Sequence, residues 1–369
     1  LSTTLDTYIR KTAKHISMPK ILKKLIDVIP RFLFELLGFF KLVRFSPDID
    51  KAKTFRSRII WEEAKRRGIK MEQTMVYGKP IDHYRAFLNG KKIYFDSIPI
   101  KPEFLDMKKS WDDKVVLKEE FLKYNIPVPN YIDLSFLKNT DENLENIFFI
   151  LQKPIIVKPR VGSRGRHTTT NIHNLEQMRE AIKIAKKICS RLIVEEHLMG
   201  SVCRATVVNG KLAGFYKAEV PFIVGDGVKT IKELIEEKNS LRQERIEPIN
   251  ISPELRDHIF RSGFKIDDIL SDKFSLSLTH RIGRLFGGIT KEMLDEIHPS
   301  FIPIFEKAFK VTGLAVAGFD AIIPDPTKPA DSQRWGIIEC NTLPFIDLHY
   351  YALEGKPKNI AGMIWDMWN

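Results

Sequence analysis

The sequence contains few residues that could form disulfide bonds or a thiolate metal site. Only three of its 369 residues are cysteines, and Cys189, Cys203 and Cys340 lie far apart without a CxxC spacing. We therefore expect reduced, buried thiols in a cytoplasmic protein, and neither a disulfide framework nor a zinc site.

Long apolar runs are also absent. No secretory signal is visible, and no run reaches the roughly eighteen apolar residues that read as a membrane-spanning helix. Residues 19–43 mix lysines with Leu, Ile and Phe, so binding at a membrane interface is one interpretation. We favour the other, in which two amphipathic helices divided at Pro30 pack on the next domain.

Acidic residues are outnumbered by basic ones. The chain has 59 Lys and Arg against 47 Asp and Glu, a formal net charge of +12. This excess favours anionic partners such as nucleotides or acidic molecules and polymers. Because the charge is spread along the chain without a basic tail, we expect no nucleic-acid partner.

The helix and strand patterns predict an α+β protein without internal repeats. Asn89-Gly90 and Asn209-Gly210 predict tight hairpin turns. A long polar region runs to about residue 286. The predicted segments are amphipathic helices over 1–50, a small α/β unit over 51–110, and two larger segments over 111–190 and 191–369.

Two apolar strands near the C-terminus carry the clearest chemical pattern. In a hairpin that turns near residues 329–330, Asp320 lies opposite Glu339, and Glu339 shares a face with Asn341. Two carboxylates and an amide oxygen suit Mg²⁺, which completes its shell with water and phosphate oxygens. Solvated acidic residues at strand ends are the alternative.

Two lysines form a second pattern. Lys158 ends an apolar strand, where a charge is costly unless it has a partner. Lys118 lies in the helix that follows "WDD". Opposite metal ligands, both would act as clamps on phosphate. Taken alone, Lys118 would be an exposed helix lysine.

The loop "VGSRGRHTTT" directly follows the strand of Lys158. Its glycines let backbone N–H groups turn inward, and its basic and hydroxyl side chains could close over a polyphosphate. The loop lacks the GxxxxGK[ST] spacing of a Walker A sequence. A plain surface turn is the alternative.

In this order the motifs resemble those of the ATP-grasp carboxylate–amine ligases. "WDDKVVLKEEFLKYNIPVP" looks like the lysine helix of that family, "IIVKPRVGSRGRHTTTNI" like its lysine strand and phosphate loop, and "LIVEEHLMG" like its adenine hinge. "GFD" and "IIECNT" look like its metal strands. The resemblance covers roughly residues 110–369 and is strongest to the cyanophycin-synthetase and glutathione-synthetase branch.

The resemblance implies the ATP-grasp fold, two α+β lobes that grip ATP, preceded by the small α/β domain and the N-terminal helices. Lobe 1 would span 111–190 and carry the phosphate loop, and lobe 2 would span 191–369 with an insert at about 225–290. The implied activity is ATP-dependent ligation of a carboxylate to an amine through an acyl phosphate, with amino acids or peptides as substrates. Mg²⁺, or alternatively Mn²⁺, would accompany ATP, and a homo-oligomer is expected.

The resemblance and its neighbouring residues also assign a site. Glu195 and Leu198 match hinge positions that hold adenine largely through backbone groups, and Arg281 and Arg284 are candidates to hold a substrate carboxylate or stabilise the intermediate. His349 matches a histidine near the acceptor site. The full set is Lys118, Lys158, Ser163, Gly165, Arg166, Glu195, Glu196 and Leu198 for the nucleotide, Asp320, Glu339 and Asn341 for the metal, and Arg281, Arg284 and His349 for catalysis.

Several positions depart from the family pattern. Val202 stands where many members have an acid for the ribose, and Asp347 stands where cyanophycin-type enzymes tend to have Arg. Arg166-His167 replaces a commoner Lys-Gly pair. The substrates therefore do not transfer from the resemblance. The alternative functions are a small-molecule kinase on the same fold and a catalytically weak nucleotide-binding or scaffold protein.

Overall fold

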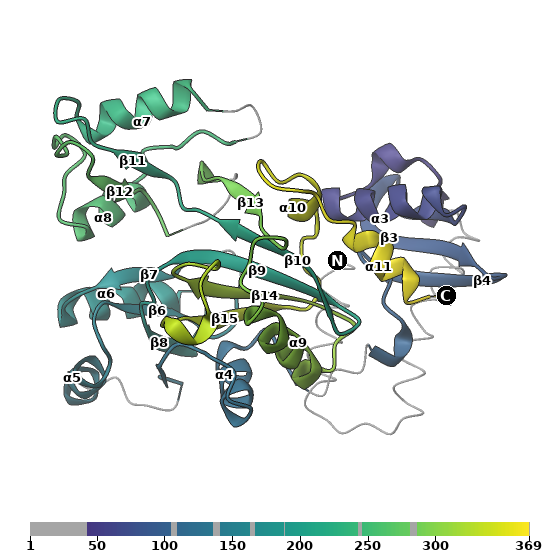
Figure 1. The fold of residues 1–369 in the computed structure, drawn as a ribbon, viewed down its shortest axis with the longest axis horizontal. Coiled ribbons are helices and arrows are strands. Elements are labelled where there is room, and N and C mark those ends of the chain that lie inside the picture. Colours follow the sequence, from purple (N-terminus) through teal and green to yellow (C-terminus); the bar gives the residue numbers. More distant parts are fainter. Residues whose placement is uncertain are drawn as a thin grey trace. The chain divides into compact units, whose positions relative to one another are not determined.

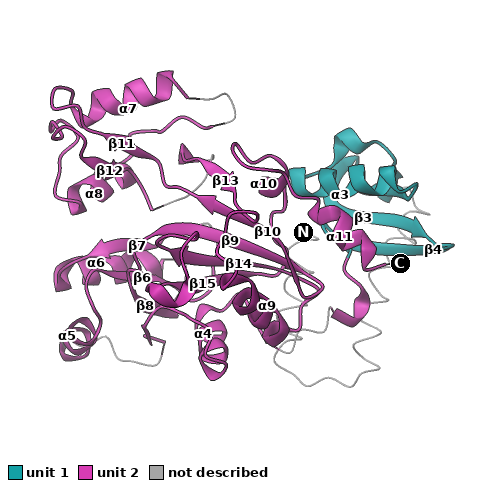
Figure 2. Cartoon of the chain, viewed as in Figure 1, with its two compact units in different colours: residues 1–99 teal, residues 100–369 magenta. Residues whose placement is uncertain are grey.

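A computed structural model gives the structure of the chain as two compact units, residues 1–99 and 100–369, which Figure 2 colours separately. The predicted N-terminal helices fall almost entirely on residues 1–42, which lie outside the described residues. The structure describes residues 43–104, 109–135, 141–162, 167–187, 189–242, 246–280 and 286–368.

The first unit combines a helix with a four-stranded antiparallel sheet. The strand order is β1-β2-β3-β4, and helix α3 contacts β2. Asn89 and Gly90 join β3 to β4 with φ values of 50° and 72°, which confirms the predicted tight turn. The elements are β1 (Val43–Ser46), η1 (Ile49–Lys51), α3 (Phe55–Arg66), β2 (Lys70–Val76), β3 (Lys79–Leu88) and β4 (Lys91–Asp96).

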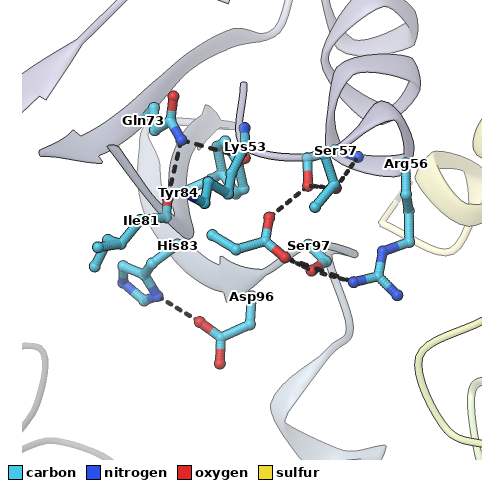
Figure 3. Close-up of polar contacts among 11 residues, drawn as sticks. Lys53, Arg56, Ser57, Gln73, Ile81, His83, Tyr84, Asp96 and Ser97 are labelled. Carbon is cyan, nitrogen blue, oxygen red and sulfur yellow. Dashed lines mark hydrogen bonds and ion pairs between the residues drawn. The ribbon is translucent and has the colours of Figure 1, made fainter. Parts of the chain in front are cut away.

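A polar network joins α3 to this sheet, and Figure 3 shows its side chains converging. Asp82 of β3 accepts a hydrogen bond from Ser57 Oγ at 2.7 Å and another from Ser97 Oγ. The buried Arg56 donates to Ser97 Oγ at 2.6 Å and lies 3.5 Å from Asp82 Oδ2. Nearby, burial raises the pKa of Tyr84 to about 12. Asp82 is therefore the shared acceptor of the network.

We expect Asp82→Ala to destabilise the first unit by about 2 kcal/mol, because two hydroxyls and a buried guanidinium lose this acceptor. Hydrogen exchange of peptides from β2 and β3, measured in the full chain, should quicken. Asp50→Ala removes an exposed carboxylate from the same unit and serves as the control. Equal protection in Asp82→Ala and the wild type would contradict the role of Asp82.

The second unit contains a five-stranded antiparallel sheet of order β13-β10-β9-β14-β15. Helices α4 and α9 contact this sheet and each other. Alternation along β9 sends Cys203, Ala205 and Val207 into their shared core and leaves Arg204 and Thr206 on the opposite face. The elements are α4 (Lys114–Lys123), β9 (Ser201–Val208), β10 (Lys211–Ala218), β13 (Thr290–Glu292), α9 (Phe301–Thr312), β14 (Val316–Ile323) and β15 (Gly336–Asn341).

A four-stranded sheet of order β5-β8-β6-β7 forms the other large layer of this unit. Ile155, Val157 and Val194 pack in a core with α6. Lys158 and Glu195, one residue out of phase, therefore point to the opposite face. The elements are β5 (Tyr131–Asp133), α5 (Asp141–Ile150), β6 (Ile155–Pro159), β7 (Thr169–Ile172), α6 (Leu175–Lys186) and β8 (Leu192–Glu196).

The long polar region noted in the sequence, which runs to about residue 286, folds around a small core of its own. Ile231 and Ile235 of α7 and Ile259 of α8 are buried together in it. Thr230 and Glu233 form a capping box at the start of α7. We call this region the insert, and Figure 1 shows its elements as one group. They are β11 (Phe222–Val224), α7 (Ile231–Ser240), α8 (Pro253–Arg261) and β12 (Ser275–Ser277).

The remaining elements are short. The 3₁₀ helices η2 (Pro102–Phe104) and η4 (Ala330–Ser332) lie in connections, and η4 forms the end of the β14–β15 turn, as predicted. Helices α10 (Asp347–Tyr350) and α11 (Ile360–Asp366) contact β10. Within the described ranges, no helix combines the length and apolarity that a membrane span requires.

Candidate active site

The predicted acidic hairpin forms as expected. Asp320 of β14 lies opposite Glu339 of β15 in the antiparallel register, which confirms the pairing inferred from the sequence. Asn341 Nδ2 donates to Asp320 Oδ2 at 3.2 Å and to the carbonyl oxygen of Gly318 at 3.4 Å. The three predicted metal ligands therefore converge on one face.

Arg204 of β9 also belongs to this cluster, and the sequence analysis missed it. Its guanidinium donates to both carboxylate oxygens of Asp320, at 2.6 and 2.7 Å. Burial disfavours the charge of Arg204, but Asp320 outweighs this effect and raises the pKa of Arg204. A charged residue within the apolar strand "SVCRATVV" was the available signal.

The donor atoms of this cluster fit Mg²⁺ if phosphate and water complete the shell. The described ranges hold no group of three or more His, Cys, Asp or Glu side chains that could bind a metal. Asp320 and Glu339 offer two carboxylates, and because Asn341 donates through Nδ2, its carbonyl oxygen would be its ligand atom for a metal. Burial, opposed by Lys114 and reinforced by Asp320, raises the pKa of Glu339, so a nearby cation would stabilise its charged form.

A buried carboxylate holds the two predicted lysines. Lys118 Nζ lies 2.9 Å from Glu195 Oε1, and Lys158 Nζ lies 2.8 Å from Glu195 Oε2. Burial would raise the pKa of Glu195, but the two ammonium groups lower it. Burial lowers the pKa of Lys118 to about 8, against the attraction of Glu195. Lys118 also donates to the carbonyl oxygen of Ile338 at 3.2 Å, so it links β8 to β15.

Lys114 is a second residue that the sequence analysis missed. It starts α4, is buried, and donates to the carbonyl oxygen of Gly162, the second residue of the predicted phosphate loop, at 3.0 Å. Burial lowers the pKa of Lys114, while Glu339 raises it. Asp113 caps α4 and pairs with Arg160 at 2.8 Å, which fixes Lys114 in place. In the sequence, the pair Asp113-Lys114 at the start of the helix was the available signal for Lys114.

Lys114 and Lys118 therefore have different surroundings. Lys118 has no exposed surface, so the interpretation of an exposed helix lysine is wrong. Lys114 lies against the start of the phosphate loop and acts electrostatically on Glu339. Of the predicted loop and catalytic residues, Ser163, Gly165, Arg166, Arg281 and Arg284 lie outside the described residues.

The hinge residues after β8 are held by contacts of their own. The carboxylate of Glu196 accepts from Asn130 N at 2.9 Å and pairs with Arg334, so it fixes the loop before β5. Leu198 is buried. Gly200 has a φ of 142°, and a Cβ there would lie 2.5 Å from the backbone carbon of Ile323. The end of the hinge therefore requires glycine.

His349 is enclosed rather than open to a substrate. Its ring has no exposed surface, Nε2 lies 2.8 Å from Thr206 Oγ1, and Nδ1 contacts the carboxylate of Glu292. Glu292 also accepts from Phe215 N at 3.0 Å. In this structure His349 positions α10 against β9 and β10. Its role near the acceptor site stays a prediction.

Histidines lie where the insert meets the sheet of strands β5, β8, β6 and β7. Burial, reinforced by His280, lowers the pKa of both His197 and His258 to about 4. His258 belongs to α8 of the insert, and His197 follows β8. Asn171 Nδ2 of β7 donates to the carbonyl oxygen of Arg261 at 3.3 Å, so α8 contacts the lobe 1 sheet directly.

This contact should weaken in acid. The pKa values of His197 and His258 in the folded chain are about 4, below the ordinary value of 6.5. The contribution of these two histidines to the stability of the folded chain is therefore complete above pH 6.5. It is lost as the pH falls toward 4, since protonation then favours the unfolded state. We expect the melting temperature to fall over this window, and to fall less in His258→Phe. The half-buried His298→Gln is the control, and equal slopes in His258→Phe and the wild type would contradict the prediction.

The chain is similar in sequence to two groups of proteins. It is 32% identical over 250 residues to the cyanophycin synthetase of Geminocystis herdmanii, which covers 66% of this chain and 28% of the relative. It is 27% identical over 227 residues to the glutathione biosynthesis bifunctional protein GshAB of Mannheimia succiniciproducens, which covers 58% and 30%. The chain thus spans less than one third of the length of these relatives. No protein-family model matches the chain.

The fold is similar to that of a solved structure. The bifunctional glutathione synthetase from Pasteurella multocida matches with a TM-score of 0.53 and 22% sequence identity, over 85% of this chain and 43% of that chain. This likeness confirms the predicted fold, the α+β ATP-grasp fold.

Proposed function

The chain belongs to the ATP-grasp ligase family, and on this premise we propose that it is an ATP-dependent carboxylate–amine ligase that releases ADP and phosphate. Amino acids or peptides are the proposed substrates. One observation carries the proposal: Lys118, which shares Glu195 with Lys158, also donates to the carbonyl oxygen of Ile338, next to Glu339 in β15. Asp320 and Asn341 lie on the same face of that sheet as Glu339. Cations and oxygen ligands thus face each other as a metal-bound triphosphate requires.

The two sides of this site would hold different parts of the nucleotide. Lys158 and Lys114 would bind phosphate oxygens as point charges. Asp320, Glu339 and Asn341 would hold Mg²⁺, or alternatively Mn²⁺, which when bound would neutralise phosphate charge. Arg204 would have to share Asp320 with the metal or release it.

The reaction needs stabilisation of charge rather than a side-chain nucleophile. A substrate carboxylate would attack the γ-phosphorus and displace ADP, giving an acyl phosphate. An amine would then attack the acyl carbon, lose a proton and expel phosphate. Negative charge builds on phosphoryl and carbonyl oxygens, and Lys114, Lys158 and Arg204 are the described cations that would stabilise it. Arg281 and Arg284 stay predictions for substrate binding.

We expect Lys158→Ala to weaken nucleotide binding by about tenfold to a hundredfold, because a clamp on phosphate is lost. Isothermal titration calorimetry with ATP and Mg²⁺ would measure the change. Lys183→Ala, which removes an exposed lysine of α6 in the same lobe, is the control. Unchanged affinity in Lys158→Ala would count against the phosphate role.

We expect Asp320→Ala and Glu339→Ala each to lower ADP release by about a hundredfold or more, since the charge that positions the metal is removed. ADP release would be assayed with amino acids and short peptides supplied in pairs. Asp331→Ala, an exposed acid in the turn of the same hairpin, should keep full activity. Near-normal turnover in both site variants would refute the metal assignment.

Mass spectrometry of the products would separate the alternatives. A ligase forms a new amide and free phosphate, whereas a kinase leaves phosphate on its substrate. Nucleotide binding without turnover would favour the weak nucleotide-binding or scaffold protein. Homo-oligomerisation and membrane association through residues 19–43 stay predictions from the sequence.

A further inference from the structure

The insert contains a cavity of about 420 Å³, and none of the described residues that line it is a candidate active-site residue. Its walls come from β11, α7, the segment 246–249 and the segment 287–289. Small-molecule sites in proteins usually have about 300–1,000 Å³. The cavity is therefore large enough for a small ligand and too small for a folded partner.

The walls of the cavity are mostly apolar. Ile223, Leu234 and Ile249 are buried members of the insert core and also line the cavity. Phe222 and Ile289 add apolar surface. Because the core fixes these side chains, the cavity presents a preformed apolar surface, which favours a ligand with an apolar body.

A half-buried lysine adds one cation to this apolar surface. Lys238 Nζ lies 5.1 Å from the centre of the Phe222 ring, and burial lowers the pKa of Lys238. Glu219, the acid that acts on it, already pairs with Lys217 at 2.8 Å. In the part of the chain that the structure describes, no acid forms an ion pair with Lys238.

The other charged residues of the lining leave it positive. Both carboxylate oxygens of Glu237 accept from Lys229 Nζ, at 3.0 and 2.9 Å, so Glu237 is neutralised. Arg242 donates to the carbonyl oxygens of Asn239 and Ile246, at 2.8 and 3.2 Å, and keeps its full charge. Arg242 and Glu247 are both exposed, so solvent and salt screen both of these opposite charges, and Lys238 is the half-buried charge among the described lining residues.

We propose that this cavity binds a small carboxylate with an apolar body. The body would lie against Phe222, Leu234 and Ile249. The carboxylate would pair with Lys238, with Arg242 as a second cation on the exposed side. The described lining shares no residue with the proposed ligase site, and the proposal does not depend on the ligase function.

Calorimetry on the full chain with sodium octanoate as the probe would test the site. We expect saturable binding of one octanoate per chain that weakens as salt is added. Lys238→Met should lower the affinity by about tenfold, which corresponds to the loss of one partly desolvated ion pair. Lys238→Arg should retain binding. Lys232→Met, an exposed lysine of the same helix outside the lining, should leave it unchanged.

Octylamine has the same apolar body as octanoate and the opposite charge. Comparing the affinities of the two probes therefore shows whether the site distinguishes the charge of its ligand. Octylamine that binds as tightly as octanoate, or octanoate affinity unchanged in Lys238→Met, would overturn the proposal, as would no saturable binding at millimolar octanoate. Hydrogen exchange in the wild type should show octanoate protecting β11 and α7. Protection confined to other elements would also overturn it, and this readout stands even if Lys238→Met fails to fold.

Discussion

The candidate site depends on one buried carboxylate, Glu195, which holds two ammonium groups from separate elements. A charge of this kind is stable away from water only when it is paired, and the loss of one partner leaves the others uncompensated. Lys118 carries the constraint further, because it also binds the carbonyl oxygen of Ile338 in β15. Glu195 and Lys118 therefore join the two sheets and hold Lys158 in place.

The five-stranded sheet carries a second ion pair, in which a cation holds a carboxylate of the candidate site. Asp320 is held by Arg204, while Glu339 keeps a raised pKa because burial and a neighbouring carboxylate both disfavour its charge. Nucleotide and metal would exchange these internal pairs for pairs with phosphate and a divalent cation. Such a site is preorganised, because its charges are already in place before a ligand arrives.

The insert is a small domain-like element with different properties. Its core of short apolar segments keeps α7 and α8 together, and its contact with lobe 1 uses neutral histidines near the hinge, with Asn171 bound to the Arg261 carbonyl. The described residues that line its cavity are none of those that carry the charges of the candidate active site.

The sequence by itself determined the register of Asp320 and Glu339, the tight turn at Asn89-Gly90, and the order of motifs that identified the fold. These features follow from local alternation and turn chemistry, which neighbouring residues fix. Only the tertiary structure decided that Lys118 is buried while Lys114 faces the phosphate loop, that Arg204 grips Asp320, and that His349 is enclosed. Each of these depends on a partner far away in the sequence. Helix α4 is packed around much of its circumference, because its buried residues are Lys114, Val115, Leu117, Lys118 and Phe121. The periodicity of its apolar residues could therefore not indicate which lysine faces the phosphate loop.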